Sequence, residues 1–341
     1  MRTLLAAFAL AVLLGALAAC GADDEAAADG GTLTVYSGRE EEIVEPLFEQ
    51  FEEQTGIDVE VRYADSAELA ATIAEEGENS PADVFFAQDA GTLGAVAGEG
   101  RLAELPEDLL ERVPAEYRDP EGRWVGTSGR ARVVAYNTEA LAESELPDSI
   151  FDYTDARWKG KIGLPPTNAS FQAFVSAMRL QAGEERTREW LEGIKANDPK
   201  FYEKNTPVVE AVASGEIEVG FVNHYYLYLV KEEQPDAPVE NHFLGAGDPG
   251  ALVNAAGVGI VEGTDDRDAA EQFVEFLLSE EGQRFYAEAA EEAEYPLVEG
   301  VEPREGLPPL DQLQGPDVAL GDLGDELEPT LELLNELGYT S

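Results

Sequence analysis

The chain has 341 residues, of which 71 are Asp or Glu and 22 are Lys or Arg, so its formal net charge is −49. This charge excludes sequence-independent binding to nucleic acid, which needs a basic surface to displace counterions. The length exceeds what one compact core usually fills, so two lobes are expected. Acidic residues spread along the whole chain fit a high-salt habitat or an acidic codon bias, and they describe habitat better than ligand.

The first 19 residues have the pattern of an export signal. Arg2 precedes an apolar run at residues 4–17 that is too short to span a bilayer comfortably. The run ends in Leu17-Ala18-Ala19-Cys20, which resembles the bacterial lipobox, and Cys20 is the only cysteine, so no intramolecular disulfide can form. We expect a lipid on Cys20 to hold the protein outside the cytoplasm, in the periplasm or at the outer face of the membrane. The alternative is an ordinary cleaved signal peptide with an incidental cysteine. Residues 20–31 predict a flexible acidic tether.

Residues 32–86 alternate strands and helices. We expect strands at 32–36, 57–63 and 83–86. A helix opens at the capping-box pair Ser37 and Glu40 and ends at Gly56, and a second covers 68–76. This order predicts an α/β lobe with a largely parallel sheet.

The same alternation resumes after Ser128. The expected strands are 131–136, 161–164, 216–222 and 251–260, and the expected helices are 171–181, 186–197, 206–213, two within 266–291, and 329–337. The strands near 131–137 and 251–260 are the expected crossings between lobes. Lobe 1 is then residues 32–131 with about 255–300, and lobe 2 is residues 132–254 with about 301–341.

Eight short motifs occur in an order that is typical of one family. They are Val35-Tyr36-Ser37-Gly38-Arg39, Pro81-Ala82-Asp83-Val84-Phe85-Phe86, Ser128-Gly129-Arg130-Ala131-Arg132-Val133-Val134, Trp158-Lys159-Gly160-Lys161-Ile162-Gly163, Tyr202-Glu203-Lys204-Asn205, Asn223-His224-Tyr225-Tyr226, Asp248-Pro249-Gly250-Ala251-Leu252-Val253 and Glu294-Tyr295-Pro296-Leu297. From residue 32 to the C-terminus the chain resembles the bacterial ferric-ion-binding proteins, a branch of the periplasmic-binding-protein superfamily with the type II fold of two hinged α/β lobes. The resemblance implies a monomeric binding protein, not an enzyme, that delivers Fe(III) to the permease and ATPase subunits of an ABC importer.

The adjacent tyrosines Tyr225 and Tyr226 match the pair that binds Fe(III) through phenolate oxygens in that family. Fe(III) is a hard cation that favours anionic oxygen donors. A free phenol titrates near pH ~10, yet a bound cation can remove its proton at neutral pH. Both side chains reach one metal only if the backbone turns between them. The alternative role is aromatic packing, since Tyr228 lies nearby.

The resemblance implies two further metal ligands, with departures from the family pattern. A histidine ligand of the family aligns with Glu40 and a glutamate ligand with Gln88, while a third tyrosine falls near Phe171, which cannot coordinate. Glu40 is either a carboxylate donor or the capping residue for Ser37. Gln88 offers a neutral oxygen or an anion contact. We expect His224 to point away from Tyr225 and to have a structural role.

Few protein ligands leave a larger share of the coordination sphere to a bound anion, which is phosphate or carbonate in that family. Arg39 matches an anion-binding arginine and lies at a predicted helix N-terminus, where backbone N–H groups favour anions. The other positions that match anion contacts of the family are Thr167, Asn168, Ala169, Ser170, Asn205 and Asn223. For each of these, capping or turn formation is the alternative role.

Other functions fit these residues less well. The run Gly245-Ala246-Gly247-Asp248-Pro249-Gly250 has dinucleotide-fingerprint spacing, but a predicted strand follows it where that fingerprint needs a helix. The chain has no Gly-x-Ser-x-Gly motif and no cysteine nucleophile besides Cys20, so hydrolase chemistry is not indicated. A binding protein for an oxyanion, or for a small organic cation such as thiamine or a polyamine, has the same fold and stays open as the alternative.

Overall fold

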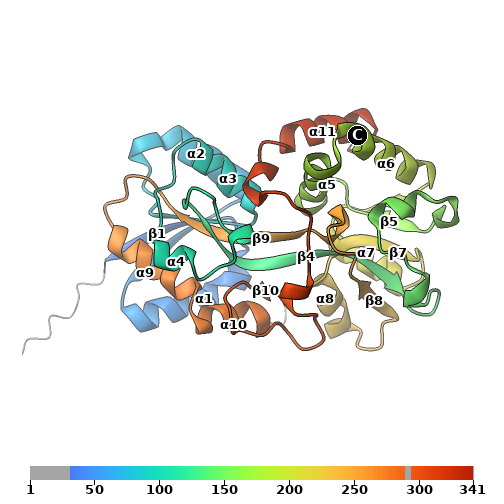
Figure 1. Ribbon diagram of the computed structural model, residues 1–341. Helices are drawn as coiled ribbons and strands as arrows, with labels where there is room; N and C mark the ends of the chain where they lie inside the picture. The colour runs from blue at the N-terminus through green and yellow to red at the C-terminus, as the bar shows by residue number, and fades with distance from the viewer. Residues whose placement is uncertain (1–30, 289–292, 341) are drawn as a thin grey trace, which may run out of the picture.

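The computed structural model describes residues 31–288 and 293–340, which form two α/β lobes side by side (Figure 1). The predicted export signal and most of the tether, Cys20 included, lie outside the described residues. Within residues 31–288 and 293–340, no helix combines the length and the apolar character that crossing a bilayer would need.

Lobe 1 is built on a mixed sheet with strand order β2-β1-β3-β9-β4. Parallel pairing joins β1 to β2 and β3, whereas β9 is antiparallel to β3 and to the first half of β4. The strands are β1 (Thr32–Ser37), β2 (Asp58–Tyr63), β3 (Val84–Ala87), β9 (Val253–Ile260), β10 (Tyr295–Pro296) and β4 (Val125–Asn137). The strand–helix alternation predicted for residues 32–86 is confirmed.

Helices cover both faces of this sheet (Figure 1). They are α1 (Glu41–Thr55), α2 (Ser66–Glu76), α3 (Ala90–Gly98), α4 (Glu107–Leu110), α9 (Arg267–Leu277) and α10 (Glu280–Glu288). On one face, the apolar side of α1 meets α9, and the Phe51 and Phe273 rings pack edge to face with centroids 5.2 Å apart. Helix α3 was not predicted from the sequence.

Lobe 2 has its own strands, which continue from the second half of β4. They are β7 (Val219–Asn223), β5 (Ile162–Leu164), β6 (Lys200–Phe201) and β8 (Val239–His242). The helices are α5 (Ala169–Ala182), α6 (Glu184–Ala196), α7 (Asn205–Ala213), α8 (Tyr226–Glu233) and α11 (Leu327–Glu336). Helix α8 and strand β8 were not predicted from the sequence.

Strand β4 passes through both lobes and changes its antiparallel partner on the way. Ala131 is the last β4 residue paired with β9, opposite Val253, and Arg132 is the first paired with β7, opposite Asn223. The Arg132 N–H still donates to the carbonyl of Leu252, 2.8 Å away, just before β9 begins. The two sheets therefore meet between two successive residues of one buried strand.

The C-terminal segment also contacts both lobes (Figure 1). A short 3₁₀ helix, η8 (Leu320–Leu323), packs on α3 of lobe 1. Helix α11 packs on α5 of lobe 2, where the hydroxyls of Ser176 and Thr330 lie 2.9 Å apart. Glycines allow the first contact, because a Cβ on Gly94 would lie 2.3 Å from the carbonyl oxygen of Gly321.

We expect Gly94→Ala to lower the free energy of unfolding by about 1–3 kcal/mol, the usual cost of overpacking. Gly98→Ala is the matched control in the same helix, because a Cβ there meets nothing within 4 Å. Its gain in helix propensity predicts unchanged or slightly higher stability. Urea unfolding measures both variants, and equal stabilities would contradict close packing of η8 on α3.

Candidate metal centre

Tyr225 and Tyr226 lie where β7 passes into α8. Tyr225 already has helical backbone angles (φ −71°, ψ −22°), and α8 begins at Tyr226. This turn brings the two side chains together, with hydroxyl oxygens 2.9 Å apart and ring centroids 4.2 Å apart. The backbone turn that a shared metal ion requires is therefore present, although the sequence did not reveal the helix that makes it.

Burial controls the charge state of this pair. Tyr225 is buried, and burial raises the pKa of its phenol well above the usual value. The neighbouring Tyr226 adds to the rise, whereas the positive charge of Arg130 opposes it. The Tyr225 phenol is therefore neutral without a cation, so a metal ion that binds it as a phenolate must release its proton.

A hydrogen-bond network beside the tyrosines gathers four of the predicted anion contacts. The Asn205 amide donates to Asn168 Oδ1 (3.1 Å) and to Ser170 Oγ (3.2 Å). Ser170 Oγ in turn donates to Asn168 Oδ1 (2.6 Å). Asn223 joins through Arg132, whose Nη1 reaches both Asn223 Oδ1 (3.1 Å) and Ser170 Oγ (3.3 Å). Asn168, Ser170, Asn205 and Asn223 thus form one polar cluster at the carboxyl ends of β5 and β7.

Two further predicted contacts, Thr167 and Ala169, belong to the turn that enters α5. Asn168 is the N-cap of α5, and its Oδ1 accepts a hydrogen bond from the Ser170 N–H at 3.0 Å. Ala169 is the first residue of the helix, and Thr167 is exposed in the turn before it. The capping role weighed for Asn168 is present together with its place in the cluster.

Arg132 is a central residue of this site that the sequence analysis did not select. Its side chain is buried on β4, and Nη2 also donates to the carbonyl of Phe221 at 2.9 Å. Burial lowers the pKa of Arg132 to about 9, and the phenols of Tyr226 and Tyr225 oppose the fall. A signal was present in the sequence, because Arg130 and Arg132 are the charged residues of a strand that is buried throughout, and charged residues are rarely buried without a partner.

A second buried charge cluster lies in lobe 1. The Arg39 side chain is 1% exposed, and its Nη1 lies 3.4 Å from Glu294 Oε2 and 3.4 Å from Ser128 Oγ. Arg130 Nε lies 3.7 Å from Glu294 Oε1. Arg130 Nε and Nη2 are buried without a hydrogen-bond partner, so this guanidinium keeps donors for a further acceptor.

Glu40 and Gln88, the two tentative lobe 1 ligands, have few contacts of their own. The expectation of a capping box is wrong, because α1 begins at Glu41 and Glu40 itself occupies the N-cap without a side-chain cap bond. Ser37 Oγ instead accepts from the N–H of Arg39 at 3.2 Å. Glu40 is exposed, and Gln88 is half-buried with its N–H donating to Ser66 Oγ at 2.9 Å. Among the described residues, neither side chain is hydrogen-bonded to Tyr225 or Tyr226 of lobe 2.

His224 joins the tyrosine turn to lobe 1. Its Nδ1 accepts from the Ala131 N–H at 3.2 Å, so the proton lies on Nε2, which donates to the carbonyl of Ala293 at 2.8 Å. Both ring nitrogens are therefore used in structural hydrogen bonds. Burial lowers the pKa of His224 to about 4, and the imidazole is neutral in the folded protein.

We expect His224→Gln to remove part of the acid sensitivity of folding. Because the folded pKa lies below the ordinary value of about 6.5, the unfolded chain binds the proton first as the pH falls. This group therefore costs stability progressively between pH ~6.5 and ~4, by up to about 3 kcal/mol. Urea unfolding of both proteins across this range measures the difference. Parallel pH profiles would contradict a neutral buried imidazole.

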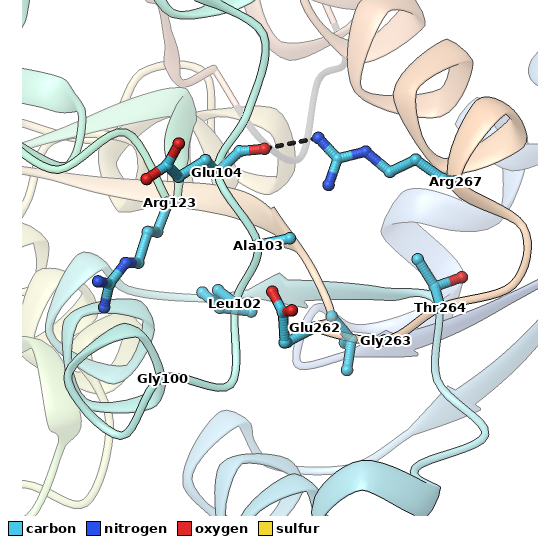
Figure 2. A pocket seen from close by; sticks show the side chains of 10 residues that line it. Gly100, Leu102, Ala103, Glu104, Arg123, Glu262, Gly263, Thr264 and Arg267 are labelled. Atoms are coloured by element: carbon cyan, nitrogen blue, oxygen red, sulfur yellow. Dashed lines mark hydrogen bonds between the residues drawn. The ribbon is translucent and has the colours of Figure 1, made fainter.

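Surface pockets elsewhere offer weaker sites. One of about 540 Å³ in lobe 1 is lined by Arg123, Arg267 and Thr264, among others (Figure 2). Both arginines are already engaged, because Arg267 donates to the carbonyl of Glu104 and Arg123 to that of Ala97. No group of three or more His, Cys, Asp and Glu side chains suited to a metal occurs in residues 31–288 and 293–340.

Two α/β lobes that share a strand, with a polar site where the sheets meet, define a type II periplasmic binding protein. The family model for bacterial extracellular solute-binding proteins matches residues 79–312, and the chain belongs to this family.

Individual relatives are similar over nearly their whole length. The major ferric iron-binding protein of Neisseria meningitidis is 35% identical over 313 residues, which cover 90% of this chain and 92% of that protein. The crystal structure of iron-bound HitA from Pseudomonas aeruginosa superposes with a TM-score of 0.82 at 35% identity, covering 90% of this chain and 99% of that one. The Trichodesmium protein IdiA (FutA), solved with iron and citrate, has a TM-score of 0.81 at 30% identity, covering 91% and 100%.

Proposed function

We propose that this protein captures Fe(III) outside the cytoplasm and delivers it to the permease and ATPase subunits of an ABC importer. The observation that carries the proposal is the pair of phenolic oxygens 2.9 Å apart at the β7–α8 turn. Two deprotonated phenolates at this spacing supply the anionic oxygen donors that Fe(III) favours. The names of the Neisseria and Pseudomonas relatives, which refer to ferric iron and bound iron, support the same cargo.

The remaining coordination comes from lobe 1 and from an anion. Glu40 is an exposed carboxylate that makes no side-chain cap bond, and it serves as the protein donor on lobe 1 once the lobes close by hinge motion. Gln88 is a weaker neutral donor. Arg39, Arg130 and the Arg132 cluster favour a synergistic oxyanion, phosphate or carbonate, because buried guanidinium groups bind oxyanions through charge-assisted hydrogen bonds. The citrate of the Trichodesmium structure makes a carboxylate chelator a further candidate.

The proposal also includes how the protein is held at the membrane and in what form it acts. A lipid on Cys20 anchors the protein to the membrane, the described lobes act as a monomer, and the protein performs no catalysis. A binding protein for an oxyanion alone is the second candidate, because Arg130 Nε and Nη2 are buried without a hydrogen-bond partner.

The tyrosine substitutions test the metal. Apo protein titrated with a ferric chelate should develop a visible tyrosinate-to-iron charge-transfer band at one iron per chain. Tyr225→Phe and Tyr226→Phe remove the donor oxygen and keep the ring, so each should shift or abolish the band and weaken iron binding about 100-fold or more, roughly 2.7 kcal/mol. Stability should fall only by about 1 kcal/mol, the usual worth of one hydrogen bond.

The pH dependence provides a second reading of the same experiment. Iron binding releases protons from both phenols, so the affinity should fall steeply as the pH is lowered. Tyr228→Phe is the matched control on α8, since Tyr228 packs under Arg304 (4.7 Å from guanidinium carbon to ring centroid). If the variants at 225 and 226 bind iron like the parent, the iron proposal fails and the oxyanion candidate replaces it.

Glu40→Gln tests the lobe 1 ligand. The change keeps the side-chain shape and removes its charge, and no cap bond is lost because Glu40 makes none. We expect iron affinity to fall about tenfold, which corresponds to about 1.4 kcal/mol, with unfolding unchanged. Competition with a chelator measures the affinity. Glu41→Gln, one residue further along, should bind like the parent, and equal affinity of all three proteins would exclude Glu40 as a ligand.

A further inference from the structure

Glu294 is the carboxylate on which the two arginines of the lobe 1 cluster converge. It lies directly before β10 and its side chain is 1% exposed. Arg39 reaches its two oxygens at 3.4 and 3.5 Å, and the Ser128 hydroxyl donates to the same group. A buried carboxylate is stable only with such partners. Glu294 therefore acts as an anion that the chain itself supplies to this cluster.

The two arginines do not share Glu294 equally. Arg39 makes hydrogen bonds to both carboxylate oxygens, whereas Arg130 approaches only to 3.7 Å through Nε, beyond hydrogen-bond range. Arg130 Nε and Nη2 remain without a hydrogen-bond partner although the residue is 5% exposed. Buried guanidinium N–H groups without acceptors are costly, so Arg130 is stabilised by any oxyanion that enters.

The segment that carries Glu294 is also tied to the tyrosine turn. The carbonyl of the preceding residue, Ala293, accepts the Nε2–H of His224, which directly precedes Tyr225. The charges of Arg130 and Glu294 both act on the Tyr225 phenol, with opposite signs. A change in the charge of Glu294 or Arg130 therefore changes the electrostatic potential at the Tyr225 phenol.

Resting on the proposed function, we propose that Glu294 positions Arg39 and competes with the synergistic oxyanion for Arg130. The carboxylate and an entering phosphate or carbonate have charges of the same sign and share the same guanidinium groups. Like charges in a buried site repel strongly, so the charge of Glu294 weakens anion binding. Its role is to hold the Arg39 and Arg130 side chains in the site and to keep anion binding weak enough for the anion to dissociate.

Anion binding to the iron-free protein tests this role. Thermal unfolding is followed while inorganic phosphate, or bicarbonate in a parallel series, replaces chloride at constant ionic strength. Glu294→Gln should have a lower Tm than the parent in chloride, because two buried arginines lose their counter-ion. It should also show a larger anion-induced rise in Tm, equivalent to anion binding about tenfold tighter by mass action. A glutamate with a merely structural role would lower Tm by the same amount at every anion concentration.

Two further variants complete the test. Glu294→Asp keeps the negative charge but moves it away from both arginines, so it should destabilise the fold less than Glu294→Gln. Its anion-induced rise in Tm should lie between those of the parent and Glu294→Gln. Glu299→Gln removes the same charge from an exposed position five residues away and should respond like the parent. An anion response in both Glu294 variants no larger than the parent's, or an equal increase in Glu299→Gln, would overturn the proposal.

The outcome is separate from that of the iron experiments, because no metal is present. A parent protein that gives no tyrosinate band but shows the predicted ranking of anion responses would retain the role of Glu294 and lose the iron function. A parent with a normal band and no anion response would retain the iron function and overturn the role of Glu294.

Discussion

The change of partner within β4 is the constraint on which the rest of the site depends. Because side chains alternate along a strand, Arg130 and Arg132 point to the same side, with one at the last lobe 1 pairings and the other at the first lobe 2 pairing. Ala131 between them donates its N–H to His224. Within these three residues, Arg130 belongs to the lobe 1 charge cluster and Ala131 is hydrogen-bonded to the tyrosine turn. Arg132 holds the lobe 2 network together.

Buried charges of this kind are expensive, and the structure offsets their cost in different ways. Arg132 is surrounded by neutral acceptors, namely Asn223, Ser170 and the carbonyl of Phe221, and burial lowers its pKa to about 9. Arg39 is compensated by a carboxylate. Arg130 has an ion-pair distance to Glu294 but unpaired donors. Natural proteins leave a buried polar group without a hydrogen-bond partner mainly where a ligand or water completes it. Of the three arginines, Arg130 is the one with such donors, so it is the one that a ligand would complete.

Much of this arrangement could be predicted from the sequence, but not the parts that depend on tertiary contacts. The apolar period of α1, the glycine that ends it and the strand–helix order predicted the α/β lobes. Tyr225 and Tyr226 were selected because they match the iron-binding pair of the family that the sequence resembles. The capping-box prediction was wrong because the Ser-x-x-Glu pattern only permits a helix to begin after Ser37. The helix begins at Glu41, three residues later, after the chain leaves β1. Helix α8 was missed because a tyrosine-rich run has weak helix propensity, and tertiary packing decided its conformation. The partners of Arg130 and Arg132 were invisible because Glu294, Ser170 and Asn223 are far away in sequence.

The charge of the whole chain and the charge of the site have opposite signs. A formal charge of −49 attracts cations at long range and repels free oxyanions, although salt screens this field beyond about 10 Å at 0.1 M. Within the site, buried arginines act over a few ångströms and are screened far less. In the function proposed above, a metal cation converts the tyrosines to phenolates, and an oxyanion beside it accepts hydrogen bonds from the buried arginines. That proposal gives the two ligands complementary charges, and it accounts for three buried arginines beside a pair of phenols in a strongly acidic protein.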